Sequence, residues 1–245
     1  MKIRTPHSHN ALAALVFGLM LSLPAQAALY DRGGGLLYDD VLNVTWLQDA
    51  NYAKTSGYDT DGLMNWGAAK TWAENLVFHD SVRNADYSDW RLASNTPVGT
   101  DWNYSYSTAG TTDLSYNITS PHSELSYMYY VNLGLKGYYS PAGTNQPDFG
   151  IFGNGTIDGQ NNVGPAKNLQ SPGYWSGTAY APYPADDAWV FVTIIGGQGN
   201  GPQGNELYAW AVRPGDVAAV PEPEAYALML VGMGLLAGVA RRKQK

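Results

Sequence analysis

Two loop segments combine aromatic rings with small polar neighbours, a pattern that suits carbohydrate binding. A sugar ring stacks its apolar face on an aromatic plane while amide, carboxylate and backbone groups bind its hydroxyls. The sequence therefore predicts a glycan-binding surface, although ordinary packing of loop aromatics would give the same composition. The candidate residues are Trp102, Tyr104 and Tyr106 in "DWNYSYSTAG", and Tyr180 and Tyr183 in "GTAYAPYPADD".

Acidic residues suggest two other kinds of chemistry. Asp59 and Asp61 in "YDTDGLMNW" have the spacing of calcium ligands, but the bidentate glutamate of an EF-hand loop is missing, and a solvated turn explains the pattern equally well. A polysaccharide hydrolase would need two carboxylates that face each other across about 5 to 10 Å. Linear spacing does not reveal such a pair. We therefore assign no catalytic residue and keep a carboxylate-based hydrolase as the alternative to a noncatalytic module.

The residue types argue against thiol and zinc chemistry. The sequence contains no cysteine, so it has no thiolate nucleophile, redox pair or disulfide. His79 and His122 stand without a second histidine or a glutamate at metal-ligand spacing, which argues against a zinc site. Apart from a candidate calcium ion at Asp59 and Asp61, we expect no cofactor.

Local patterns predict the elements that would hold these loops. The segments "GLLYDD" and "LNVTWL" predict two strands joined by a turn. Asn65 can cap a helix along "WGAAKTWAENLVF", whose apolar residues recur at helical spacing, so we expect Trp66 and Trp72 in the core. A second helix is predicted to start at Pro121, after a serine cap, and to end at Gly134.

The remaining segments predict further strands and one ion pair. "DAWVFVTII" and "ELYAWAVRP" have strand character, and the glycine-rich "GGQGNGPQGN" between them is expected to be a turn. In "YSDWRLAS", we expect Asp89 and Arg91 to pair and to fix a turn against the core. Strands, helices and strands again predict an α+β fold.

The N-terminal residues predict export. Lys2 and Arg4 precede an apolar run from Ala11 to Leu23, and "PAQA" then provides a cleavage signature before Ala28. The run is too short to span a membrane, and it lacks the polar periodicity of a helix that belongs to a folded domain. We therefore interpret residues 1–27 as a signal peptide.

The C-terminal segment, residues 221–245, contains a Pro-Glu-Pro triplet, an apolar run over residues 225–240 and a basic end. At about 1.5 Å per residue the run reaches roughly 24 Å, which is marginal for a hydrocarbon core about 30 Å thick. Basic residues resist translocation, so they should hold the C-terminus in the cytoplasm. The residues that define the pattern are Pro221, Glu222, Pro223, Arg241, Arg242 and Lys243.

This arrangement resembles the PEP-CTERM sorting signal, which exosortase-type membrane enzymes recognise in Gram-negative bacteria. The resemblance implies export across the inner membrane and a transient anchor that is cut near the Pro-Glu-Pro triplet. The protein would then pass to the cell surface or the extracellular polymer. A permanent single-span anchor is the alternative.

Residues 28–220, the expected ectodomain, contain in order "DVLNVTWLQDAN", "YSDWRLAS", "SELSYMYYVNLG", "YWSGT" and "ELYAWAVRPG". This ordered set resembles the domain of unknown function 1566 (DUF1566), also called the Lcl C-terminal domain. The resemblance implies a single C-type-lectin-like α+β domain with a mainly antiparallel sheet and two helices. The family includes surface and adhesin modules, and no general catalytic activity comes with it.

Charge narrows the expected partners. Of the 14 Lys and Arg and the 21 Asp and Glu residues, the two terminal segments hold six and two, which leaves a formal charge of −11 for residues 28–220. Such a surface repels nucleic acid and anionic polysaccharide unless a cation bridges them. We therefore predict a noncatalytic surface or matrix module that binds glycan or protein within exopolysaccharide or biofilm. The alternative is a secreted polysaccharide hydrolase.

Overall fold

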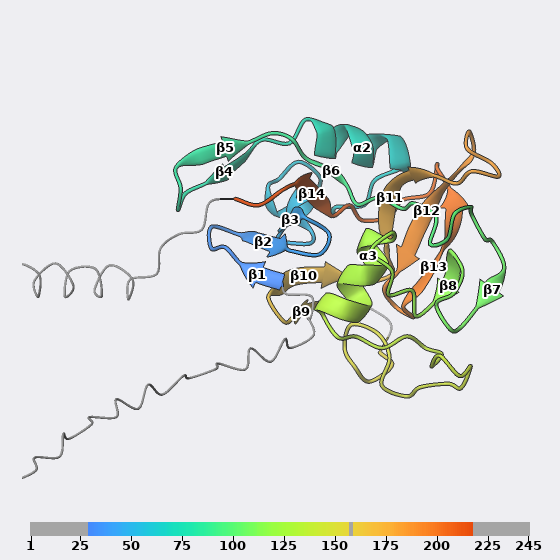
Figure 1. Ribbon diagram of the computed structural model, residues 1–245. Coiled ribbons are helices and arrows are strands. Elements are labelled where there is room, and N and C mark those ends of the chain that lie inside the picture. Colours follow the sequence, from blue (N-terminus) through green and yellow to red (C-terminus); the bar gives the residue numbers. More distant parts are fainter. Residues whose placement is uncertain (1–28, 157–158, 218–245) are drawn as a thin grey trace, which may run out of the picture.

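The computed structural model describes residues 29–156 and 159–217 (Figure 1). The expected signal peptide (1–27) and sorting segment (221–245), with the hydrophobic helices predicted there, lie outside the described residues. Within the described ranges, no helix has both the length and the apolar character needed to cross a membrane. The structure thus concerns the expected ectodomain.

The first sheet brings the two ends of the described chain together. Its strands follow the order β1-β2-β3-β14-β6, and neighbouring strands are antiparallel. The predicted hairpin is confirmed, since Leu36 pairs with Leu47, and Asp39 Oδ1 accepts hydrogen bonds from the backbone N–H groups of Val41 and Leu42 in the turn. The strands are β1 (Leu29–Asp31), β2 (Leu36–Asp39), β3 (Val44–Leu47), β6 (Arg91–Leu92) and β14 (Ala211–Pro214).

The second sheet, at the right of Figure 1, has the order β11-β12-β13-β8-β7, with antiparallel neighbours except for the parallel pair β7–β8. The predicted glycine-rich turn was wrong, because most of that segment forms β13 and pairs with β12. The glycines of β13 have no side chains and so leave room for large neighbours, such as Trp175 beside Gly201. The strands are β7 (Tyr106–Ser107), β8 (Leu114–Tyr116), β11 (Tyr174–Ala179), β12 (Asp187–Val192) and β13 (Gly197–Pro202).

Two short antiparallel hairpins flank the sheets. They are β4 (Phe78–Asp80) with β5 (Ala85–Tyr87), and β9 (Gln160–Val163) with β10 (Ala166–Gln170). Together with a few short helices, this mostly antiparallel pairing confirms the predicted α+β class.

Both helices that the sequence predicts are present, but the second one has different boundaries from those predicted. As predicted, the Asn65 side chain accepts a hydrogen bond from the Ala68 N–H and caps a helix. The second helix starts after Ser123 rather than at Pro121, because Pro121 and His122 form a turn in which the Ser123 N–H donates to the Ser120 carbonyl. The helices are α1 (Tyr52–Thr55), α2 (Trp66–Glu74), α3 (Glu124–Tyr127) and the π-helix η1 (Met128–Asn132), which continues α3.

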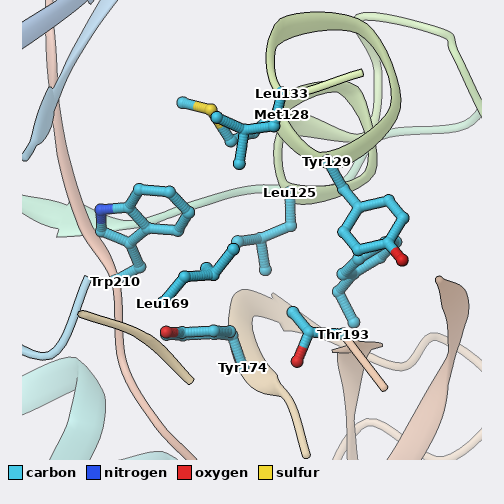
Figure 2. A pocket seen from close by; sticks show the side chains of 9 residues that line it. Leu125, Met128, Tyr129, Leu133, Leu169, Tyr174, Thr193 and Trp210 are labelled. Carbon is cyan, nitrogen blue, oxygen red and sulfur yellow. The ribbon is translucent and has the colours of Figure 1, made fainter. Parts of the chain in front are cut away.

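Two groups of buried side chains form the core. One joins α2 to both sheets and contains Trp72 and Trp175, with Trp66 half-buried at its edge. The other joins α3 and η1 to the sheets and contains Trp46 and Trp210. This second group contains a cavity of about 10 Å³, and Figure 2 shows the side chains that line it. It has room for no more than about one water molecule, so we interpret it as core packing.

The predicted pair between Asp89 and Arg91 was wrong, since each residue has a different partner. The Asp89 carboxylate binds Arg213 on β14, with Oδ1 2.7 Å from Nε and Oδ2 3.0 Å from Nη2. Arg91 binds Glu124 through two hydrogen bonds of 2.7 Å. Arg91 pairs within the first sheet and its side chain reaches the start of α3, so tertiary packing rather than chain proximity selects the partners.

The Asp89–Arg213 pair predicts a pH-dependent contribution to stability. The hydrogen bond from Arg213 is the main cause that lowers the pKa of Asp89. A lowered pKa means that the contribution is present above the ordinary carboxyl pKa of about 3.9 and is lost as pH falls through the folded-state value. Because the Asp89 side chain is 49% exposed, we expect Asp89→Asn to cost only about 0.5–1 kcal/mol near neutral pH. Thermal unfolding of both proteins from pH 7 to pH 2 checks this, and an equal difference at both ends would contradict it.

Candidate functional site

Three of the five predicted aromatic residues contact Trp189, which was not predicted as a site residue, and a fourth contacts one of these three. Trp102 and Tyr104 lie nearly parallel to its indole, with ring centroids 5.1 and 6.1 Å away and interplanar angles of 26° and 19°. Tyr180 meets it edge to face at 4.9 Å, and Tyr183 lies 6.5 Å from Tyr180. Trp189 is fully buried, Trp102 and Tyr104 are half-buried, and Tyr183 is 62% exposed. We call these five residues the aromatic cluster.

Buried Asp113 fixes the loop that carries Trp102 and Tyr104. Its carboxylate oxygens accept hydrogen bonds of 2.6 Å from the backbone N–H groups of Val98 and Asn103. The Asp113 N–H in turn donates to the Asn103 carbonyl at 3.0 Å. Bonds from N–H groups to an ionised carboxylate are short and strong. The loop is therefore held at one place against β12.

The turn between β11 and β12 forms the other side of the aromatic cluster. The Tyr180 N–H donates to the Asp187 carbonyl at 2.9 Å, and the Tyr183 N–H donates to the Tyr180 carbonyl at 2.9 Å. On β13, the Asn200 amide donates to Asp187 Oδ2 at 2.6 Å. Amide and carboxylate groups thus border the ring of Tyr180, where they can accept and donate hydrogen bonds to sugar hydroxyls.

Burial affects two of the cluster's hydroxyls. It raises the pKa of Tyr104 and of Tyr180 further above the ordinary value of about 10, so both phenols are neutral donors at physiological pH. The Trp189 indole N–H has no hydrogen-bond partner in the part of the chain that the structure describes. The central indole is therefore held by ring contacts.

Tyr106, the fifth predicted residue, lies apart from the aromatic cluster. It is 64% exposed and contacts Tyr116, with ring centroids 6.3 Å apart. The strand alternation in "DAWVFV" could have pointed to Trp189, because the aromatic residues 189 and 191 fall on one face of β12. No local pattern showed that Trp102 would lie beside that face.

Asp59 and Asp61 lie together in a turn. Asp59 Oδ1 accepts hydrogen bonds from the N–H groups of Asp61 and Gly62, and Asp61 Oδ1 accepts one from the Leu63 N–H. These backbone hydrogen bonds lower the pKa of Asp59. Within residues 29–156 and 159–217, no group of three or more His, Cys, Asp or Glu side chains is placed to hold a metal ion. Calcium binding here stays a prediction.

Two of the buried carboxylates serve the fold. Burial raises the pKa of Asp39, a shift that can mark an acid catalyst. Asp39 is inaccessible, however, and its oxygens accept hydrogen bonds from two backbone N–H groups and the Asn132 amide. Buried Asp80 forms an ion pair of 2.5 Å with Arg83. Both carboxylates hold turns or neighbouring segments in place.

Comparison with known families explains the C-terminal segment. The family described as the PEP-CTERM protein-sorting motif matches residues 219–244. The match contains all six residues of the predicted sorting pattern, Pro221, Glu222, Pro223, Arg241, Arg242 and Lys243, and confirms that prediction. The motif implies an exported protein that an exosortase-type enzyme sorts to the cell surface of a Gram-negative bacterium.

The same comparison does not extend to the ectodomain. No family match supports the resemblance to DUF1566. No curated protein and no solved structure matches the chain significantly. Any proposal about what residues 29–217 bind therefore has to be argued from the geometry of these residues.

Proposed function

We propose that the ectodomain is a noncatalytic carbohydrate-binding module that acts at the cell surface or in the extracellular polymer after exosortase processing. The observation that carries the proposal is the aromatic cluster, in which half-buried Trp102 and Tyr104 lie nearly parallel to each other at 6.2 Å and to buried Trp189. Rings that are fixed in nearly parallel orientation offer a preorganised surface for a sugar ring, which reduces the ordering cost of binding.

The chemistry around the rings favours a neutral glycan. The formal charge of −11 over residues 28–220 opposes the approach of anionic polymers. Beside the rings, the phenol of Tyr180 and the Asp187–Asn200 pair supply hydrogen-bonding groups. A ring face for stacking and polar groups at its edge are the two features that a sugar needs.

The hydrolase alternative has less support. Asp39 has a raised pKa but is closed to solvent, and buried Asp113 is occupied by two backbone N–H groups. Neither carboxylate is free to donate a proton to a glycosidic oxygen.

We also propose that the domain is C-type-lectin-like and related to DUF1566. The antiparallel sheets and the helices α2 and α3 support this, and an experimental structure compared with lectin-like domains would test it.

Trp102→Ala and Tyr104→Ala are each expected to weaken glycan binding at least about tenfold, because each removes a stacking face. A glycan array identifies a ligand, and titration calorimetry then measures the affinity of each variant. Tyr58→Ala is the matched control, since Tyr58 is 59% exposed and lies outside the aromatic cluster. Its affinity should equal that of the wild type.

Two results would contradict this function. Unchanged affinity and unchanged retention in the extracellular matrix for both variants would remove the aromatic cluster from binding. Release of shortened oligosaccharides during incubation, followed by chromatography, would instead establish the hydrolase.

A further inference from the structure

A shallow groove of about 240 Å³ crosses strands β12, β13 and β8. Val190 and Val192 lie along it, and Gly197 and Gly199 of β13 contribute no side chains. The rings of Tyr106 and Tyr116 also line it. Among these described lining residues none is charged, in a domain that is strongly acidic. The groove is therefore suited to a neutral occupant.

This groove and the aromatic cluster lie on opposite faces of the second sheet. Trp189 and Val190 are consecutive on β12, and successive side chains of a strand point to opposite faces. Trp189 is the centre of the aromatic cluster, whereas Val190 lines the groove. Gly199 pairs with Val190 in the ladder, so it belongs to the groove face. An occupant of one face leaves the other face open.

Three features of the groove point to a sugar ring. Tyr106 is 64% exposed and presents a phenol ring beside a floor without side chains at Gly197 and Gly199. Ser115, which also lines the groove, has a φ of +100°, a strain that persists mostly at functional positions. The volume lies below the roughly 300–1,000 Å³ of pockets for drug-sized ligands, which fits a single ring.

We propose that this groove is a second site for a neutral glycan, so that one molecule bridges two glycan chains from opposite faces of the same sheet. The proposal rests on the proposed function and makes the protein a cross-linker of the extracellular polymer. Bivalent contact raises the apparent affinity for a polymer by about 10² to 10⁴ relative to a single site, without new contacts.

Gly199→Val tests the groove with little risk to the fold. A Cβ at Gly199 meets no atom within 4 Å, and Gly199 has no positive φ that a side chain would strain. Valine favours strands, so the melting temperature should equal or exceed that of the wild type. Gly204→Val is the matched control, because Gly204 is equally open but lies in an exposed turn outside the groove.

The experiment uses protein purified from the producing cells and the exopolysaccharide extracted from the same cells. Pull-down measures binding, and light scattering measures the bridging of chains. We expect wild type and Gly204→Val to bind and to scatter strongly, and Gly199→Val to bind with at least about a tenfold loss of apparent affinity and no scattering increase. Scattering by Gly199→Val equal to the wild type overturns the proposal.

Other outcomes separate this proposal from the proposed function. If Trp102→Ala with Tyr104→Ala abolishes binding while Gly199→Val changes nothing, the aromatic cluster binds glycan and the second site does not exist. If only Gly199→Val loses binding, the groove is the sole site and the bridging proposal fails. If the wild type binds no polymer, both ideas fail. If sedimentation shows dimers that Gly199→Val dissociates, the groove is a contact between copies.

Discussion

Neutral replacement of Arg241, Arg242 and Lys243, or replacement of Pro221 and Pro223 by alanine, is expected to stop the protein from reaching the cell surface. All five residues lie inside the segment that matches the PEP-CTERM sorting motif. The basic residues should hold the C-terminus in the cytoplasm, and the prolines are expected to disfavour a helix at the processing site. Losing either feature traps or misroutes the precursor.

Fractionation and immunoblotting measure this effect. Lys245→Gln is the control, because Lys245 lies beyond the matched residues 219–244 and should not change surface arrival. The ectodomain should keep its protease resistance in every variant, since none of the substitutions changes a core side chain described within residues 29–217. Normal surface arrival of both the basic-residue and the proline variants would leave the tail as a permanent anchor.

Patterns that depend on neighbouring residues could be predicted from the sequence. The β2–β3 hairpin and the Asn65 cap of α2 both follow from contacts within a few residues. The sorting motif is also continuous along the chain. In each case the physical cause, a turn, a cap or a hydrophobic run, lies within the segment itself.

Partners distant in the chain could not be predicted. Arg91 pairs with Glu124 and Asp89 with Arg213, across 33 and 124 residues. The pairing of β14 with β6 in the first sheet brings Arg213 close to Asp89, and Glu124 reaches Arg91 from α3, outside the sheet. Strand β13 escaped prediction for a related reason, because its glycines have low strand propensity and only pairing with β12 and β8 makes it a strand.

The candidate site contains both features that the sequence predicts and features that it does not. Trp102, Tyr104, Tyr180 and Tyr183, which composition selected as binding candidates, lie together in the structure, but the residue at their centre, Trp189, was assigned only to a strand. Tyr106 lies on the opposite face of the second sheet from this cluster, among the residues that line the groove. The side of a sheet that each loop covers is a property of the tertiary fold.

Glu124→Ala is expected to lower the free energy of unfolding by about 2–4 kcal/mol, because it leaves a cation and a backbone donor without their acceptor. The Glu124 carboxylate binds Arg91 Nη1 and Nη2, each at 2.7 Å, and accepts the Ser94 N–H at 2.6 Å. These bonds tie β6 to the first residue of α3. The expected decrease in the free energy of unfolding is smaller than for a fully buried ion pair, because the Arg91 side chain is 38% exposed.

Thermal unfolding should show a decrease of roughly 5–15 °C in melting temperature for Glu124→Ala. Asp148→Asn is the control, because its pair with Lys136 is exposed on both sides, and it should leave the melting temperature unchanged. A double-mutant cycle with Arg91→Met isolates the pair, and we expect a coupling energy of about 1.5–3 kcal/mol. A coupling near zero would mean that Glu124 acts through Ser94 alone, and the tie between β6 and α3 would then be a backbone contact rather than an ion pair.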